Sequence, residues 1–262
     1  MIFSKVARYL KYMLFSHHRR GHGIHSPFVF DLVSRVFRNK IDPEIILKVE
    51  QVRRKMITDK RTIPVLDLGS GSRIVKSTLG RVSEIASLSP VPAKYGVFLS
   101  RMAAEFGNPA IIELGTSIGI STMYLSMSSP ESKIYTIEGS PAIAEIARQN
   151  FHGSGLNNIT VLEGPFDDVL PRLLSDRIVP GLVYIDGNHR KEPVIRYFNQ
   201  VAEAADKNTV IIIDDINYSN EMSEAWEQIK LNEKVSISID IFRMGICFFR
   251  DMINHNNYTI RY

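Results

Sequence analysis

From Pro109 to residue 230, short apolar runs alternate with longer amphipathic segments, and no other feature of the sequence constrains the fold as much. The apolar runs are typical of buried strands, and they cover residues 110–114, 133–137, 159–162, 182–185 and 210–213. The segments between and after them have helical periodicity, over residues 117–128, 140–152, 166–175, 190–205 and 220–230. Strands that alternate with helices in this way predict a mainly parallel sheet with helices on both faces.

Beyond residue 230 the pattern changes, because two strand-like segments follow one another without a helix between them. Residues 235–242 alternate with period two, and residues 244–249 follow after one short turn. Such a pair predicts an antiparallel hairpin that completes the parallel sheet.

The segment before the α/β pattern is expected to be mainly helical. Apolar residues recur at helical spacing through residues 1–60, and two further helices are expected within residues 81–106. We therefore divide the 262-residue chain into a helical N-terminal extension, residues 1–80, and an α/β domain, residues 81–262. A chain of this length can bury a core of ordinary size without disulfide or metal support.

The composition is that of an ordinary globular protein. Hydrophobic residues make up 44% and charged residues 23%, which argues against a disordered or fibrous chain. The apolar stretches near the start are too short for a membrane span, and they do not have the pattern of a secretory signal. The single cysteine, Cys247, cannot form an internal disulfide, which suits a reducing compartment. We therefore expect a cytoplasmic protein.

Positive charge gathers in the first quarter of the chain. Residues 1–61 contain 14 Lys and Arg against 5 Asp and Glu, a balance of +9, whereas the whole chain carries +4. Such a segment can attract an anionic partner such as RNA, a phosphorylated metabolite or a membrane surface, although a solvated helical face is the more ordinary explanation.

A turn rich in glycine and histidine, residues 17–25, lies between the first two expected helices. Its histidines suggest a metal site, but cysteines and carboxylates are missing nearby. A structural or substrate-gating loop is the preferred interpretation.

Two segments compete for the glycine-rich turn that binds a cofactor after a first strand. The Leu-Asp-Leu-Gly-Ser-Gly run around Gly69 is, taken alone, the better imitation of the usual signature. The turn at Gly115, however, is followed at once by a helix, and Glu138 follows 23 residues later at the end of an apolar run. An acidic residue at about that distance can bind both ribose hydroxyls, so the turn at Gly115 is the predicted cofactor site. The Gly69 turn is then either a surface turn entering a helix or a loop that covers the substrate.

The turn at Gly115 favours S-adenosylmethionine (SAM) over NAD. A dinucleotide-binding turn has the pattern G-x-G-x-x-G, whereas the sequence from Gly115 is Gly-Thr-Ser-Ile-Gly. Glu113, two residues before the glycine, is typical of SAM sites, where an acid serves the cationic methionine end of the cofactor.

These motifs resemble the class I SAM-dependent methyltransferases related to catechol and caffeoyl-CoA O-methyltransferases, in the group whose fourth-strand motif is Asp-Gly-x-His. The resemblance extends from about Ser89 to Asp215 and rests on residues 112–121, 136–138, 162–171, 184–189 and 212–215. It implies a Rossmann-like, seven-stranded class I methyltransferase sheet, mostly parallel with a C-terminal antiparallel hairpin, joined to the helical N-terminal extension.

The same resemblance implies which residues bind SAM. Glu138 should bind the ribose, Phe166 should pack on the adenine ring, and Asp167 should accept a hydrogen bond from the exocyclic amine. The ordinary alternatives are that Phe166 is a core aromatic residue and that Asp167 is a helix-starting acid. The predicted cofactor-binding set is Glu113, Gly115, Thr116, Ser117, Gly119, Glu138, Gly139, Gly164, Pro165, Phe166, Asp167 and Asp186.

Acidic residues at the later strand ends, together with one histidine, are the predicted reactive groups. In the catechol-type enzymes the positions of Asp186, Asp214 and Asp215 hold a divalent metal that binds the acceptor hydroxyls. These three aspartates are therefore predicted ligands of Mg²⁺ or another divalent cation, with a metal-free site as the alternative. This sequence departs from the family, because Asp215 replaces the usual amide and His189 stands where those enzymes carry a catalytic lysine. His189, as a base, and Asp186 are the predicted catalytic residues.

The predicted function is transfer of a methyl group from SAM to the hydroxyl of a small-molecule acceptor. One alternative is a tRNA-modifying methyltransferase that binds nucleic acid through the basic N-terminal segment. Another is a SAM- or nucleotide-binding module without turnover, and an NAD-linked dehydrogenase is the weakest. Lys94 and Tyr95 lie where the family closes a lid over SAM, so they are candidates for cofactor or acceptor contact, beside a plain helix start. A homodimer is left open.

Overall fold

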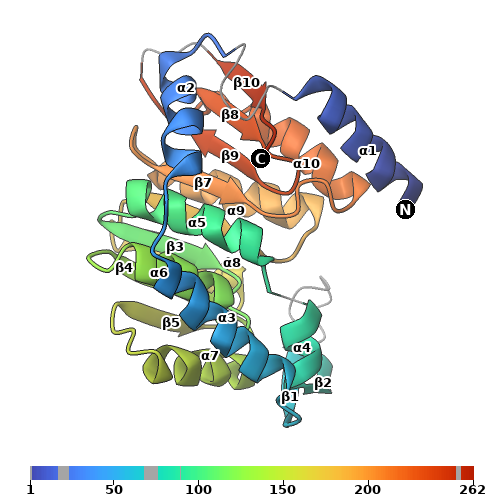
Figure 1. Ribbon diagram of the computed structural model, residues 1–262, viewed down its shortest axis with the longest axis vertical. Coiled ribbons are helices and arrows are strands. Elements are labelled where there is room, and N and C mark those ends of the chain that lie inside the picture. The colour runs from blue at the N-terminus through green and yellow to red at the C-terminus, as the bar shows by residue number, and fades with distance from the viewer. Residues whose placement is uncertain (1, 17–23, 68–75, 89, 252–254) are drawn as a thin grey trace.

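The central feature of the computed structural model is an eight-stranded sheet with the order β10-β8-β9-β7-β6-β3-β4-β5 (Figure 1). The structure describes residues 2–16, 24–67, 76–88, 90–251 and 255–262. The predicted α/β fold is confirmed, and the sheet has one strand more than the seven expected.

The parallel part of the sheet consists of strands whose bounds agree with the predicted ones to within one residue. They are β3 (Ala110–Leu114), β4 (Lys133–Glu138), β5 (Ile159–Glu163), β6 (Leu182–Ile185) and β7 (Val210–Ile213). The chain runs outward from β3 through β4 to β5 and then returns to β6 on the other side of β3. This reversal places the ends of β3 and β6 side by side, at the position where open α/β sheets bind ligands.

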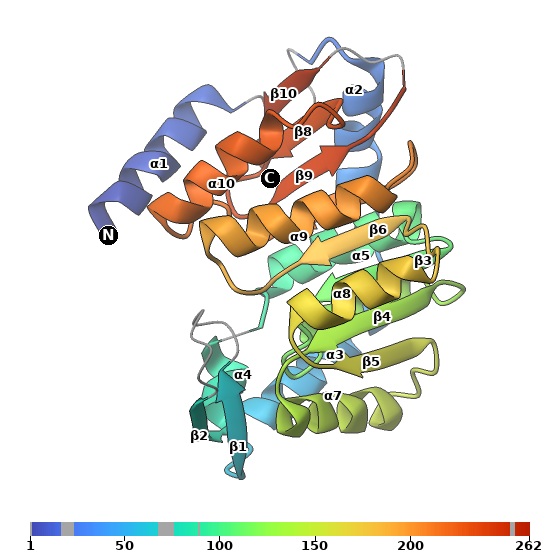
Figure 2. The same ribbon diagram turned by 180° about the vertical axis from the view of Figure 1, so that it is seen from behind.

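Helices cover both faces of the sheet. The helices that follow the parallel strands are α6 (Ile120–Ser128), α7 (Pro141–Gly153), α8 (Phe166–Ser175), α9 (Lys191–Ala204) and α10 (Asn220–Lys230). The helices α8, α9 and α10 lie on the face of the sheet that Figure 2 shows from behind. Their buried residues share one apolar core with the sheet. The first of the five, α6, begins later than predicted, because residues 115–119 form a turn with positive φ at Gly115, Ser117 and Gly119.

The C-terminal strands form the predicted antiparallel hairpin. β8 (Ile237–Asp240) pairs with β9 (Gly245–Phe248), and β9 is antiparallel to β7. The additional strand β10 (Asn256–Thr259) pairs parallel with β8 at the edge of the sheet. The β8–β9 turn therefore lies at the same sheet edge as the end of β7.

The N-terminal segment contains the expected helices, α1 (Ile2–Phe15), α2 (Pro27–Ser34), the short 3₁₀ helix η1 (Val36–Arg38) and α3 (Pro43–Ile57). The helix α1 lies beside α10 in both views (Figures 1 and 2). The Tyr12 hydroxyl of α1 donates to the Ile260 backbone oxygen at 2.7 Å. Residues of α2 and α3 share apolar cores with α5 (Ala93–Phe106) and α6 respectively. The division at residue 80 stays a prediction, since these cores cross it.

The region after α3 corrects one expectation. β1 (Thr62–Asp67) and β2 (Lys76–Arg81) form a separate antiparallel sheet, and α4 (Val82–Leu88) begins only after β2. The first described element after the Gly69 turn is therefore a strand and not a helix, because residues 76–81 pair along their whole length with β1. The turn itself, residues 68–75, lies outside the described residues, as does most of the predicted histidine-rich turn, residues 17–23.

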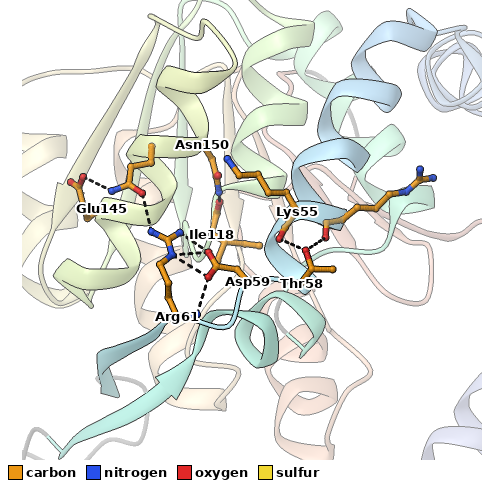
Figure 3. A network of polar contacts seen from close by, with 9 residues as sticks. Lys55, Thr58, Asp59, Arg61, Ile118, Glu145 and Asn150 are labelled. Carbon is orange, nitrogen blue, oxygen red and sulfur yellow. Dashed lines mark hydrogen bonds and ion pairs between the residues drawn. The ribbon is translucent and has the colours of Figure 1, made fainter.

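Polar contacts attach this two-stranded sheet to α7 (Figure 3). The Arg61 guanidinium donates to Asp59 at 2.8 Å and to the side-chain oxygen of Gln149 at 3.4 Å. Gln149 in turn donates to Glu145 on the same helix at 3.0 Å. The start of β1 is thereby held against the helix that follows β4.

None of the helices in the described parts of the chain has the length and apolar character that a membrane crossing requires.

Candidate functional site

A cavity of about 830 Å³ opens at the carboxyl ends of the parallel strands. This volume lies within the range of small-molecule and cofactor sites. The predicted residues that line it are Gly115, Ser117, Glu138, Gly139, Gly164, Pro165, Phe166, Asp167, Asp186, His189 and Asp215.

The turn after β3 presents backbone to this cavity. Gly115 has a φ of +109°, and its position beside Asp186 leaves no room for a side chain. The backbone N–H groups of Gly115 and Thr116 donate to the Ile137 oxygen at 3.0 and 3.2 Å. Asn150 donates to the backbone oxygen of Ile118 at 2.9 Å, as Figure 3 shows. The turn is thus fixed from two sides before any ligand binds.

Glu138 lies at the end of β4 and faces the same turn. Its two carboxylate oxygens accept hydrogen bonds from the backbone N–H groups of Ser117 and Ser140, each at 2.9 Å. Burial raises the pKa of Glu138, an effect that these two hydrogen bonds oppose. A carboxylate held in this way has lone pairs left to accept hydroxyl protons.

Two polar atoms of the lining residues lack a partner. Among the described residues, the Ser117 hydroxyl and the Asn188 side-chain oxygen are buried without any hydrogen bond. Buried polar atoms are normally paired, so a ligand rich in hydroxyl and amine groups fits this lining. SAM has such groups.

Three predicted cofactor residues do not line the cavity. The Glu113 carboxylate is fully buried beneath the turn, where it accepts from the hydroxyls of Thr122 and Thr136. The Thr116 hydroxyl also bonds to Thr136, and Gly119 is in contact distance of Phe151 on α7. Side chains alternate between the two faces of a strand, and that of Glu113 points into the α6 side. In this structure these three residues support the turn from behind, and their direct contact with the cofactor stays a prediction.

The residues after β5 surround another part of the cavity. The Phe166 ring lies against Gly187 and meets Tyr197 edge-on, with ring centroids 5.6 Å apart. Phe166 is only partly buried against the core, so it lines the cavity and packs on the core at once. Asp167 forms a two-point pair with Arg196, at 2.7 and 2.9 Å, which the sequence did not indicate.

The loop after β6 carries the predicted catalytic pair. His189 Nε2 lies 3.5 Å from Asp186 Oδ1, and the Tyr184 hydroxyl donates to Asp186 Oδ2 at 3.1 Å. Burial and the neighbouring carboxylates of Asp214 and Asp215 raise the pKa of Asp186 well above its usual range. Asn188 and His189 both have positive φ, +67° and +34°, an unfavourable backbone geometry that is often found at functional sites.

Two of the three predicted metal ligands contact an arginine of the chain. Asp214 is fully buried, and both of its carboxylate oxygens accept hydrogen bonds from Arg243, at 2.9 and 2.6 Å. The same guanidinium lies 3.6 Å from Asp215. Within the described parts of the chain, no group of three or more His, Cys, Asp or Glu side chains is arranged to hold a metal ion. The divalent cation stays a prediction, and the structure adds that a guanidinium of the chain already pairs with two of its three predicted ligands.

Sequence reasoning missed Arg243, which lines the cavity from the β8–β9 turn. No short-range motif marks it, since it comes 29 residues after Asp214 and reaches the site only through antiparallel pairing of β9 with β7. It also missed the wall formed by Val65 and Leu66 of β1 and by Ile85 and Leu88 of α4. Leu66 is three residues before Gly69 in the sequence, but the Gly69 turn itself, whose alternative interpretation was a loop over the substrate, lies outside the described residues.

Lys94 and Tyr95, which were predicted to lie at a lid over SAM, do not line this cavity. They line a second one, of about 440 Å³, together with Tyr9, Tyr12 and Phe242. The Arg243 guanidinium carbon lies 5.7 Å from the centre of the Tyr95 ring. Tyr95 therefore lies between this aromatic cavity and the acidic cluster.

Comparison with known sequences agrees with this geometry. Residues 112–216 match the profile of a family described as a methyltransferase domain. The chain is 32% identical over 128 residues to a catechol O-methyltransferase of Mycobacterium tuberculosis, covering 48% of this chain and 56% of that protein. It is 29% identical over 133 residues to a catechol O-methyltransferase of Niastella koreensis, covering 50% and 58%. The chain thus spans somewhat more than half the length of these curated relatives.

Solved structures show the same fold. A Podospora anserina methyltransferase bound to S-adenosylhomocysteine (SAH) has a TM-score of 0.59 at 14% identity, over 87% of this chain and 97% of that one. An O-methyltransferase of Bacillus cereus in complex with SAH has a TM-score of 0.56 at 22% identity, over 84% and 97%. The class I methyltransferase fold is confirmed, as is the resemblance of the central residues to catechol-type O-methyltransferases.

Proposed function

We propose that this chain, whose residues 112–216 belong to the methyltransferase domain family, transfers a methyl group from SAM to a hydroxyl of a small-molecule acceptor. The observation that carries the proposal is the position of Glu138, whose carboxylate lines the cavity beside the glycine turn. An acid at the second strand end, next to exposed backbone at the first, is the arrangement that binds a nucleoside.

Each part of the cavity has a role in holding SAM. Gly115 and Ser117 provide backbone and an unpaired hydroxyl for the methionine end, and Glu138 accepts from the ribose hydroxyls. Phe166 and the backbone of residues 164–165 surround the adenine. When bound, SAM supplies an electrophilic sulfonium methyl group, which passes to the acceptor oxygen and leaves SAH.

The loop after β6 handles the acceptor proton. His189 lines the cavity and takes the proton from the acceptor hydroxyl, because a neutral imidazole is a base near physiological pH. Asp186 lies 3.5 Å from His189 and helps to orient it. The Tyr184 hydroxyl donates to Asp186 and holds that carboxyl group in place. The remaining acceleration comes from positioning two reactants in one enclosed site.

A small-molecule acceptor suits this cavity better than a nucleic acid. Arg35, Lys48, Arg53 and Arg61, which contribute to the basic N-terminal segment, each form an ion pair with an acidic residue. A side chain that already pairs with a carboxylate is less available for a direct contact to a phosphate. The divalent cation predicted from the sequence is not included in the proposal, because Arg243 already occupies both oxygens of Asp214.

Calorimetric titration with SAH tests the cofactor assignment. We expect Glu138→Ala to weaken SAH binding at least tenfold, whereas Glu163→Ala should leave it unchanged. Glu163 is a matched control, because it pairs in register with Glu138 at the end of β5 but bonds to Arg148 and does not line the cavity. Equal affinity of the two variants would remove the proposed site. Formation of methylated product from SAM and catechol, followed by mass spectrometry, then tests the reaction.

A further inference from the structure

Within the described residues, Arg243 brings a guanidinium into the acidic cluster at the strand ends. Asp186, Asp214 and Asp215 lie at the ends of β6 and β7, close enough for the charges of the latter two to act on Asp186. Arg243 comes from the β8–β9 turn on the same edge of the sheet. Three carboxylates that converge without a cation would repel one another strongly, so the guanidinium is what makes this arrangement stable.

The contact between Arg243 and Asp214 fixes the orientation of the guanidinium as well as pairing opposite charges. Nε and Nη2 face the two oxygens of Asp214 in the planar two-point geometry that suits Arg and not Lys. Nη2 also lies 3.6 Å from Asp215 Oδ1, and the Arg243 backbone oxygen accepts from the Ile216 N–H at 3.1 Å. The side chain is therefore fixed at both ends.

Arg243 is nevertheless open to the cavity. Its side chain is 24% exposed, whereas that of Asp214 is 0% exposed. It lines the cavity with Asp186, His189 and Asp215, so the positive charge faces the side on which an acceptor would lie.

We propose that Arg243 takes the place of a divalent cation in this cluster, and that its guanidinium, without a metal ion, holds the acceptor oxygen beside His189. The second half of this inference rests on the proposed methyl transfer, but the first half does not. In the reaction, the hydroxyl proton passes to His189, and the oxygen that loses it gains negative charge. The neighbouring guanidinium stabilises that charge until the oxygen forms its bond to the methyl group.

Direct measurement of Mn²⁺ binding tests the inference without activity. Bound Mn²⁺ loses the electron paramagnetic resonance signal of the free ion, so a titration at pH 8 gives the affinity. We expect the wild-type protein to bind no Mn²⁺ up to millimolar concentrations. Arg243→Gln removes the guanidinium from Asp214 and Asp215, and we expect this variant to bind Mn²⁺ at least tenfold more tightly than the wild type. Arg148→Gln is the control, because Arg148 pairs with Glu163 away from the cavity.

Further variants and a second titration separate the possible results. Arg243→Lys keeps the positive charge and should bind no Mn²⁺. The double variant Arg243→Gln/Asp214→Asn should lose the Mn²⁺ binding that Arg243→Gln alone gains. Tight Mn²⁺ binding by the wild type would overturn the inference, as would a folded Arg243→Gln variant that gains none. SAH calorimetry on the same samples reports separately on the proposed function. If methyl transfer occurs, we expect it to be unaffected by EDTA and reduced at least a hundredfold in Arg243→Gln.

Discussion

A Cβ atom on Gly115 would lie 2.0 Å from the backbone oxygen of Asp186, where β3 and β6 end side by side. Any side chain at position 115 would therefore push apart the two strand ends that form the floor of the cavity. The φ of +109° adds a second requirement for glycine. Strand packing thus requires the glycine of the cofactor turn, independently of any ligand.

Gly115→Ala should destabilise the protein and remove SAH binding. The backbone conformation alone costs about 1–3 kcal/mol for a residue with a Cβ, and the collision with Asp186 adds to it. Gly155→Ala is the matched control, because Gly155 also has a positive φ, +72°, but nothing lies within 4 Å of its Cβ position. Denaturant unfolding should show that Gly115→Ala lowers the free energy of unfolding clearly more than Gly155→Ala does. Equal decreases would contradict the steric explanation.

Glu113 should make the stability depend on pH. Burial raises the pKa of its carboxyl from 4.5 to about 7. Between these two pH values the folded protein keeps a proton on Glu113 that the unfolded chain releases. The resulting contribution to the free energy of unfolding is complete below about pH 4.5 and is lost as pH rises to about 7. The loss amounts to roughly 3 kcal/mol, taking about 1.4 kcal/mol per pKa unit.

Glu113→Gln should remove this dependence, because the amide stays neutral and can still accept from Thr122 and Thr136. Unfolding free energies of variant and wild type should therefore diverge in favour of the variant as pH rises from about 5 to about 8. If the unfolding free energies of variant and wild type stay parallel over this pH range, the buried carboxyl of Glu113 is not the source of the pH dependence.

His189→Ala should lower turnover far more than cofactor binding. Loss of a general base costs about 10²–10⁴ in rate, while SAH affinity should change little, since His189 is assigned to the acceptor side. His152→Ala, an exposed histidine in the last turn of α7, provides the control. Single-turnover rates with catechol and SAH calorimetry measure the two effects, and a full rate in His189→Ala would exclude its role as base.

Phe166→Leu should separate a role in adenine binding from a role in the core. Loss of an aromatic stacking partner costs about 0.5–1.5 kcal/mol, so SAH affinity should fall up to about tenfold with little change in stability. Phe198→Leu, in the same apolar core but fully buried, should reduce stability and leave affinity unchanged. The opposite pattern would make Phe166 a core residue only.

Local sequence determined most of the α/β domain. The periods of apolar residues predict β3 to β7 and their helices, because each element must bury one face against its neighbours. The acidic and glycine residues that end these strands then meet at one sheet edge, since parallel strands all end on the same side. For this reason the order of strands and helices along the chain is enough to predict that Gly115, Glu138 and Asp186 lie together.

Only the tertiary structure decided what those residues do to one another. Glu113 points inward, where it meets the hydroxyls of Thr122 and Thr136. Residues of β1 and α4 form one wall of the cavity, which no local motif predicts. Arg243 reached Asp214 through the return of an antiparallel strand, a contact that no local spacing encodes. Charge pairing between distant segments depends on the whole sheet, and so the sequence predicted three aspartates at one edge while the fold supplied their cation.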